Sequence, residues 1–136
     1  MLIHDYLEQQ IEFEKKYGSN TLVLMQVGSF FEFYGVNNNE EKIGKPENVA
    51  EYYKLRKTGQ LKFVVGHTDR EWEEMETTID MFRNAGVEWP VWVMPTGARE
   101  EEQTRGAGKV AEKAFKKGYN VAARVHVYLF GNAIGT

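Results

Sequence analysis

The 136-residue sequence contains no cysteine, which excludes disulfides, thiolate nucleophiles and cysteine-held zinc or iron–sulfur sites in this chain. It also has no apolar run close to the roughly eighteen residues that a membrane-spanning helix needs. The N-terminal stretch MLIHDYLEQQIEFEKK carries acids where a secretory signal peptide has bases and a long apolar core. We therefore expect a cytoplasmic protein without a membrane segment.

A basic surplus is missing as well. Residues 1–56 hold six Lys or Arg against nine Asp or Glu, and residues 57–136 hold eleven against eleven, which gives the net charge of −3. Nucleic-acid binding draws much of its affinity from counterion release by basic side chains. Any DNA contact of this chain is therefore expected to be local and weak, or assisted by another module.

What the sequence does contain is ordinary for a globular domain, with 42% hydrophobic and 27% charged residues in a chain long enough to bury a core. The first part combines helical spacing of apolar residues, a β-branched and aliphatic run, and turn signals. The elements predicted there are a helix over 4–17 that ends at Gly18, strands over 21–27 and 30–34 with a turn at Gly28-Ser29, and a short helix over 47–57.

From about residue 60 the sequence alternates apolar strands with amphipathic helices. Thr68 and Glu71 have the spacing of a capping box, which opens a helix with an apolar stripe. That stripe is formed by Trp72, Met75, Ile79 and Phe82. The predicted elements are strands over 61–65, 91–94 and 120–130, a helix from Thr68 to Gly86, and a helix from Glu100–Glu102 to Gly118.

Two consecutive β-α-β connections predict a parallel three-stranded sheet, since such crossovers are almost always right-handed. The fold class expected is α/β, an N-terminal helix plus β-hairpin joined to a β-α-β-α-β unit with a small, mostly parallel sheet. A sheet of this size is short of partners, so the hairpin or another chain could extend it.

The hairpin carries the most unusual stretch, in which four aromatic residues surround the single acid Glu32. Strand alternation places Phe30 and Glu32 on one face and Phe31 and Phe33 on the other. A plain hairpin would pack Phe31 and Phe33 inward and leave Glu32 in solvent. Alternatively, the face with Phe30 and Glu32 could stack on a flat ligand and hydrogen-bond it, because base stacking on an aromatic ring gives about 1–3 kcal/mol.

The stretch YGSNTLVLMQVGSFFEFYGV resembles the start of the mismatch-recognition domain of the DNA repair protein family MutS, over about residues 4–45. The family motif of the Gly-Asp-Phe-Tyr-Glu type stands here as Gly28-Ser29-Phe30-Phe31-Glu32. The resemblance implies that Phe30 wedges into the minor groove and stacks on a mispaired base, while Glu32 hydrogen-bonds that base. The nucleotide-hydrolysing module of the family has no counterpart in this length.

A second resemblance covers about residues 60–136. LKFVV, VWVMPTGAREEE and the terminal ARVHVYLFGNAIGT are similar to the C-terminal part of 7-carboxy-7-deazaguanine synthase. That family consists of radical S-adenosylmethionine enzymes of the queuosine pathway, which have an incomplete α/β barrel. This resemblance implies a substrate pocket near the last strand. The family's three-cysteine cluster motif is absent from this sequence, so the reductive chemistry cannot happen in this chain alone.

Four residues of the second part are candidates for substrate binding under that resemblance: Thr96, Arg124, His126 and Asn132. His126 has a plain alternative as a partly buried histidine paired with a neighbour. Thr96 follows a predicted parallel strand, and ligands of parallel α/β sheets bind at those carboxyl ends. No histidine pair has metal-ligand spacing, so neither a metal nor a cofactor is expected.

The sequence thus predicts a MutS-like segment over 1–45, a linker or short helix over 46–59, and a partial-barrel unit over 60–136. The first hypothesis is a non-catalytic module that binds mismatched double-stranded DNA weakly through Phe30 and Glu32. The alternative is an incomplete 7-carboxy-7-deazaguanine synthase fragment that needs a cluster-bearing partner chain to complete the sheet or barrel. An inert fusion of two partial modules is the third possibility.

Overall fold

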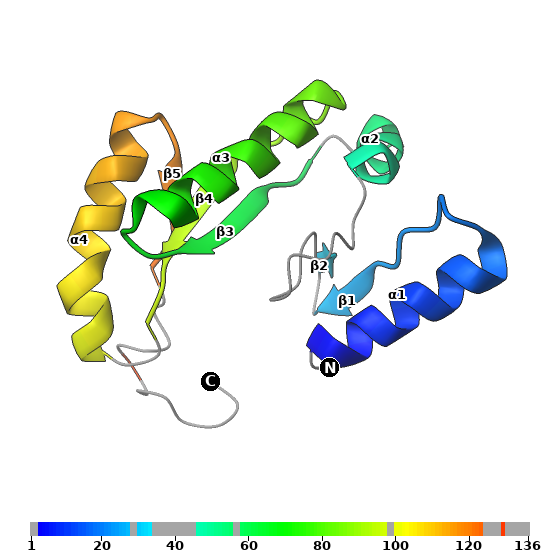
Figure 1. The fold of residues 1–136 in the computed structure, drawn as a ribbon, viewed down its shortest axis with the longest axis horizontal. Coiled ribbons are helices and arrows are strands. Elements are labelled where there is room, and N and C mark those ends of the chain that lie inside the picture. Colours follow the sequence, from blue (N-terminus) through cyan, green and yellow to red (C-terminus); the bar gives the residue numbers. More distant parts are fainter. Residues whose placement is uncertain are drawn as a thin grey trace. The chain divides into compact units, whose positions relative to one another are not determined.

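The computed structural model describes residues 3–27, 30–33, 46–55, 58–97, 100–123 and 129. They form two compact units, Met1–Arg56 with Ala85–Val87, and Lys57–Asn84 with Glu88–Thr136. The first contains helices and an antiparallel two-stranded sheet, and the second contains helices and a parallel three-stranded sheet (Figure 1). The expected α/β fold class is therefore confirmed.

The first unit begins with helix α1, Ile3–Tyr17, as the spacing of its apolar residues predicts. Gly18 follows with a φ of 107°, the left-handed conformation in which glycine ends helices at little cost. Its amide donates to the carbonyl of Glu14, at 2.9 Å. One side of α1 is buried, with Tyr6 at 0% and Gln10 at 2% exposure.

The hairpin of this unit is shorter than the sequence predicts. Strand β1 is Met25–Val27 and strand β2 is Phe30–Glu32, and they pair antiparallel. Residues 21–24 belong to no strand, although their aliphatic run predicts one. The Thr21 carbonyl and the amide and carbonyl of Val23 are instead hydrogen-bonded to side chains of α1. The turn predicted at Gly28-Ser29 and the loop after residue 33 lie outside the described residues.

Helix α2, Pro46–Leu55, matches the short helix predicted for this region to within one or two residues. Proline suits the first turn of a helix because its missing amide hydrogen is not needed there. The helix buries Val49 and Ala50. The side-chain amide of Asn48 donates to the carbonyl of Ser19 at 3.2 Å, so α2 contacts the segment that follows α1.

The second unit contains the predicted parallel sheet, in the order β3-β4-β5. Leu61 of β3 is in register with Val91 of β4, and Trp92 of β4 with Asn120 of β5. The strands are β3, Leu61–Val65; β4, Val91–Pro95; and β5, Asn120–Val121. Beyond β5, Ala122 and Ala123 are not in a strand and Leu129 is helical, so the predicted last strand is wrong at those three positions. Residues 124–128 and 130 lie outside the described part.

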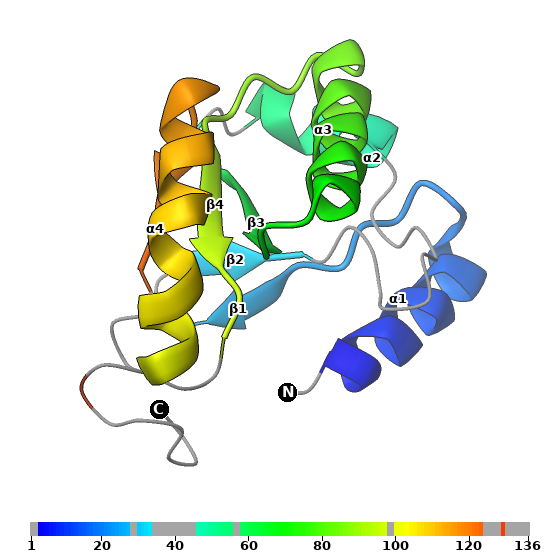
Figure 2. The ribbon, with the colours of Figure 1, turned by 60° about the vertical axis from the view of Figure 1, so that its left-hand side comes forward.

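Helices α3, Asp69–Asn84, and α4, Glu100–Lys116, connect these strands. Right-handed crossovers in the same direction place both helices on one face of the sheet (Figures 1 and 2). That face is apolar, since Leu61, Val65, Val91 and Val93 are buried. The predicted stripe of α3 is confirmed, because Trp72, Met75, Ile79 and Phe82 are all at most 5% exposed.

Two further contacts tie the second unit together. The indole nitrogen of Trp72 donates to the carbonyl of Gly66 at 2.9 Å, and the Lys113 ammonium lies 4.9 Å from the centroid of a Trp72 ring. Gly59 leaves room for the buried indole of Trp89, because a Cβ atom at this position would lie 2.6 Å from the nearest ring atom.

No helix among the described residues is long and apolar enough to cross a membrane.

Candidate functional site

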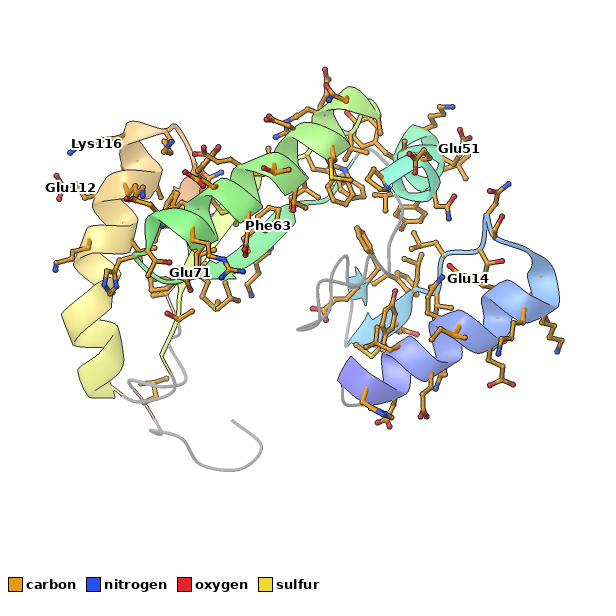
Figure 3. All side chains as sticks on the ribbon, viewed as in Figure 1. Glu14, Glu51, Phe63, Glu71, Glu112 and Lys116 are labelled. Carbon is orange, nitrogen blue, oxygen red and sulfur yellow. The ribbon has the colours of Figure 1, made fainter. Side chains whose placement is uncertain are left out.

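The hairpin is anchored to α1 by polar side chains. The Gln10 side chain receives a hydrogen bond from the Val23 amide and donates to the Thr21 carbonyl, both at 2.8 Å. It also donates to the Glu14 carboxylate at 2.8 Å, on the helix shown in Figure 3. The Tyr6 hydroxyl donates to the Val23 carbonyl at 2.9 Å. These bonds give residues 21–23 the partners that a neighbouring strand would otherwise supply, just before β1 begins.

The register of β1 and β2 defines the two faces of the hairpin. Met25 pairs with Glu32, Gln26 with Phe31, and Val27 with Phe30. Directly opposed residues of an antiparallel pair lie on the same face. Positions 30 and 32 therefore share one face with Met25, as strand alternation predicts, and Gln26 and Phe31 share the other face.

The exposure of the hairpin side chains differs from that of a plain core-facing hairpin. Phe31 is 59% exposed, and Glu32 and Gln26 are exposed too. Phe33 and Met25 are half-buried. The side chain of Phe30 is outside the described part of the chain, where only its backbone is placed. The hairpin thus presents a solvent-accessible aromatic ring, a carboxylate and an amide within three pairs of residues.

Residues 1–56 contain few Lys and Arg side chains, and some of these already have a partner within the first unit. Lys54 forms an ion pair with Glu51 at 2.7 Å, and the Lys16 ammonium lies 5.2 Å from the centroid of the Tyr17 ring. Residues 1–56 carry three more acids than bases. The electrostatic field of this segment therefore opposes a polyanion, so binding through the hairpin has to come from stacking and hydrogen bonds.

The carboxyl ends of β3 and β4 are the second candidate region. Thr96 is exposed directly after β4, and its amide donates to the Val65 carbonyl at 3.0 Å. Ligands of parallel α/β sheets bind at this edge. Of the substrate-binding candidates, Thr96 alone can be placed, since Arg124, His126 and Asn132 lie outside the described residues.

The start of α3 at this edge is already occupied by a carboxylate of the chain itself. Glu71 accepts hydrogen bonds from the amides of Gly66 and Thr68, at 3.2 and 3.3 Å, and from the Thr68 hydroxyl at 2.6 Å (Figure 3). The Glu71 amide in turn donates to the Thr68 hydroxyl oxygen at 3.3 Å, so the predicted capping box is confirmed. An external anion would have to displace Glu71 from the Gly66 and Thr68 amides.

The same contacts shift the acidity of Glu71. The hydrogen bond from the Thr68 hydroxyl, followed by those from the Thr68 and Gly66 amides, lowers the pKa of Glu71 below its usual value, although burial of the carboxyl group acts the other way. A carboxylate held in this way stays ionised at neutral pH.

Within the described residues no group of three His, Asp or Glu side chains could hold a metal ion.

Three side chains make contacts that the sequence pattern does not predict. Gln10 reaches backbone groups 11 and 13 residues away, and Glu71 reaches back past the capping box to Gly66. Lys113 bridges to α3, where it pairs with Asp69 at 3.1 Å. A polar residue at a buried position of a helical pattern is the one clue that could have identified Gln10.

Comparisons with models of protein families, with curated proteins and with solved structures found no match for this chain.

Proposed function

We propose that this chain is a non-catalytic DNA-binding module of the mismatch-recognition type, in which Phe30 stacks on a mispaired base and Glu32 hydrogen-bonds that base. The observation that supports this most is the register of β1 and β2, which assigns positions 30 and 32 to one face, with an exposed Glu32. The resemblance of residues 4–45 to MutS gives the same two residues these roles.

The energetics favour a weak interaction that depends on a defect in the DNA. Stacking gives about 1–3 kcal/mol per base, and separating a base step costs a few kcal/mol. A matched duplex therefore offers no net gain, whereas a mispaired base is already less well held. The carboxylate of Glu32 adds a favourable contact where the base presents an N–H donor, and it repels phosphates otherwise.

The test is fluorescence anisotropy with labelled mismatched and matched duplexes of one sequence context at low salt. We expect the wild-type chain to prefer the mismatched duplex, and Phe30→Ala to reduce that preference by roughly 5- to 150-fold, the equivalent of one lost stacking contact. Phe115→Ala is the matched control, because Phe115 is an exposed phenylalanine on α4 at 66% exposure. The proposal fails if Phe30→Ala binds both duplexes as the wild type does.

A second proposal, an incomplete 7-carboxy-7-deazaguanine synthase fragment, is supported by the exposed Thr96 at the carboxyl end of β4. Under it, Thr96, Arg124, His126 and Asn132 contact a 7-deazapurine, and a partner chain supplies the iron–sulfur cluster. Isothermal titration with a 7-deazapurine tests this directly. Binding that His126→Ala abolishes supports this second proposal. The absence of any heat of binding to the wild-type chain contradicts it.

A further inference from the structure

Strand β3 forms an outer edge of the parallel sheet, because β4 is its only partner among the described strands. The Leu61 amide donates to the Pro90 carbonyl of the segment leading into β4, at 3.0 Å. Since successive residues of a strand turn their backbone groups to opposite sides, positions 61, 63 and 65 are the ones that bond to β4. The amides and carbonyls of Lys62 and Val64 therefore point away from the sheet.

The side chains at this edge are exposed as well. Lys62 and Val64 lie on the face of the sheet opposite to the buried Leu61 and Val65, and Val64 is 52% exposed. Strands β1 and β2 do not extend the edge, since they form a sheet of their own. An edge strand with outward backbone groups and an exposed apolar side chain is a template for another strand.

We infer that β3 pairs antiparallel with β3 of a second copy of this chain, about a two-fold axis at Phe63. This register places Lys62 directly opposite Val64 of the second copy. Opposed residues of an antiparallel pair exchange both backbone hydrogen bonds at every second pair, and positions 62 and 64 supply the outward groups for this exchange. The edge is thus complementary to itself, which favours a second copy over an unrelated strand. The inference is independent of the proposed DNA-binding function.

The side chains of this register are also compatible with pairing. A lysine on an edge strand often discourages pairing, but here Lys62 lies opposite an apolar residue and not opposite its own counterpart. Its aliphatic part covers the exposed Val64 of the second copy while the ammonium group stays in water. Two strands of five residues bury less than the roughly 1,000 Å² of a stable interface, so we expect a weak dimer that depends on concentration.

The test is sedimentation equilibrium of the full chain at low salt, at concentrations from about 10 μM to about 1 mM. Val64→Glu places a carboxylate opposite Lys62 of the second copy, and Val64→Lys places a like charge there. We expect Val64→Glu to dimerise more tightly than Val64→Lys by at least about 4-fold, because the dimer contains this pair twice. Lys62→Glu combined with Val64→Lys exchanges the two charges and should dimerise as tightly as Val64→Glu.

The matched control makes the same charge changes at Phe115, which is 66% exposed on α4. Phe115→Glu and Phe115→Lys should dimerise alike. An equal difference between these two variants would overturn the inference, because the net charge of the chain would then explain the effect.

Two further results would overturn it. A wild-type chain that stays monomeric up to about 1 mM would leave this edge to another partner or to solvent. Equal affinities of Val64→Glu and Val64→Lys would show an apolar contact at Val64 without strand pairing, since both variants remove the apolar side chain. Tighter association of Val64→Glu than of the wild type supports the pairing even if Val64→Lys fails to fold, because misfolding does not create a charge-specific dimer.

Discussion

The hairpin and the parallel sheet are held in place by different kinds of contact. The segment before β1 is fixed by polar side chains, with Gln10 and Tyr6 of α1 bonded to the backbone of Thr21 and Val23. Strands β3 and β4 are fixed by burial of apolar side chains under α3 and α4, where Trp72 is 2% exposed and Val93 is 0% exposed. The first arrangement depends on a few directional bonds, and the second on apolar area.

The two regions also differ in which side chains stay exposed. Gln10 and Tyr6 hold the backbone that leads into β1, and the aromatic ring of Phe31 stays exposed. The parallel sheet uses the side chains of one face for its core, and its carboxyl edge is partly filled by Glu71. Directional anchoring by a few residues therefore goes together with an exposed aromatic ring in the hairpin, whereas the apolar face of the parallel sheet is buried.

The largest effect expected from this comparison is the loss of the indole at Trp72. Trp72→Ala removes a buried ring, its hydrogen bond to Gly66 and its contact with Lys113, and should cost about 3–5 kcal/mol of unfolding free energy. Urea unfolding followed by the fluorescence of Trp89 and Trp92 measures it. Trp72→Phe keeps much of the apolar area and should cost less; equal losses would mean that the hydrogen bond, and not burial, dominates.

An intermediate effect is expected from the polar anchor of the hairpin. Gln10→Leu keeps the side-chain volume but leaves the Thr21 carbonyl and the Val23 amide without their partner, which should cost about 1–3 kcal/mol. Urea unfolding followed by circular dichroism at 222 nm measures it. Gln9→Leu makes the same change one residue earlier, at a half-buried position. A loss no greater than that of Gln9→Leu would show that apolar contacts, and not the anchor, hold this region.

The helices and the parallel sheet could be predicted because their signals are local and periodic. The stripe from Trp72 to Phe82 repeats every three or four residues, and LKFVV is a continuous apolar run of strand length. The run over 21–27 has the same strand signal, but its first part is not paired with a strand, since the competing partner is a helix side chain. That competition depends on tertiary structure, which a periodic pattern does not contain.

The candidate site was predictable in register and not in exposure. Period-two alternation assigns positions 30 and 32 to one face, and the pairing of β1 with β2 agrees. Alternation does not say which face meets the core, so the exposed position of Phe31 could not be derived from it. The last strand is shorter than predicted. The Ala122 amide still donates to the Val93 carbonyl at 2.9 Å, but neither Ala122 nor Ala123 is in a strand.

The smallest effect concerns a place where the unit of the parallel sheet also relies on directional bonds, the Glu71 carboxylate at the start of α3. Glu71→Gln removes a charge that accepts hydrogen bonds from Thr68 and Gly66, and should cost about 1 kcal/mol at neutral pH. Urea unfolding at several pH values measures the difference from the wild type. Glu73→Gln, an exposed neighbour on the same helix, should leave the unfolding free energy unchanged within about 0.5 kcal/mol.

The lowered pKa of Glu71 determines how the free energy of unfolding changes with pH. Because the pKa of Glu71 is lowered in the folded chain from its usual value of 4.5, the folded state binds a proton less readily than the unfolded state. The stabilisation is therefore fully present above pH 4.5 and is lost as the pH falls through the lowered pKa. The difference between wild type and Glu71→Gln should shrink over that range. A difference that stays constant down to acidic pH would mean that protonated Glu71 caps α3 as well as the ionised carboxylate does.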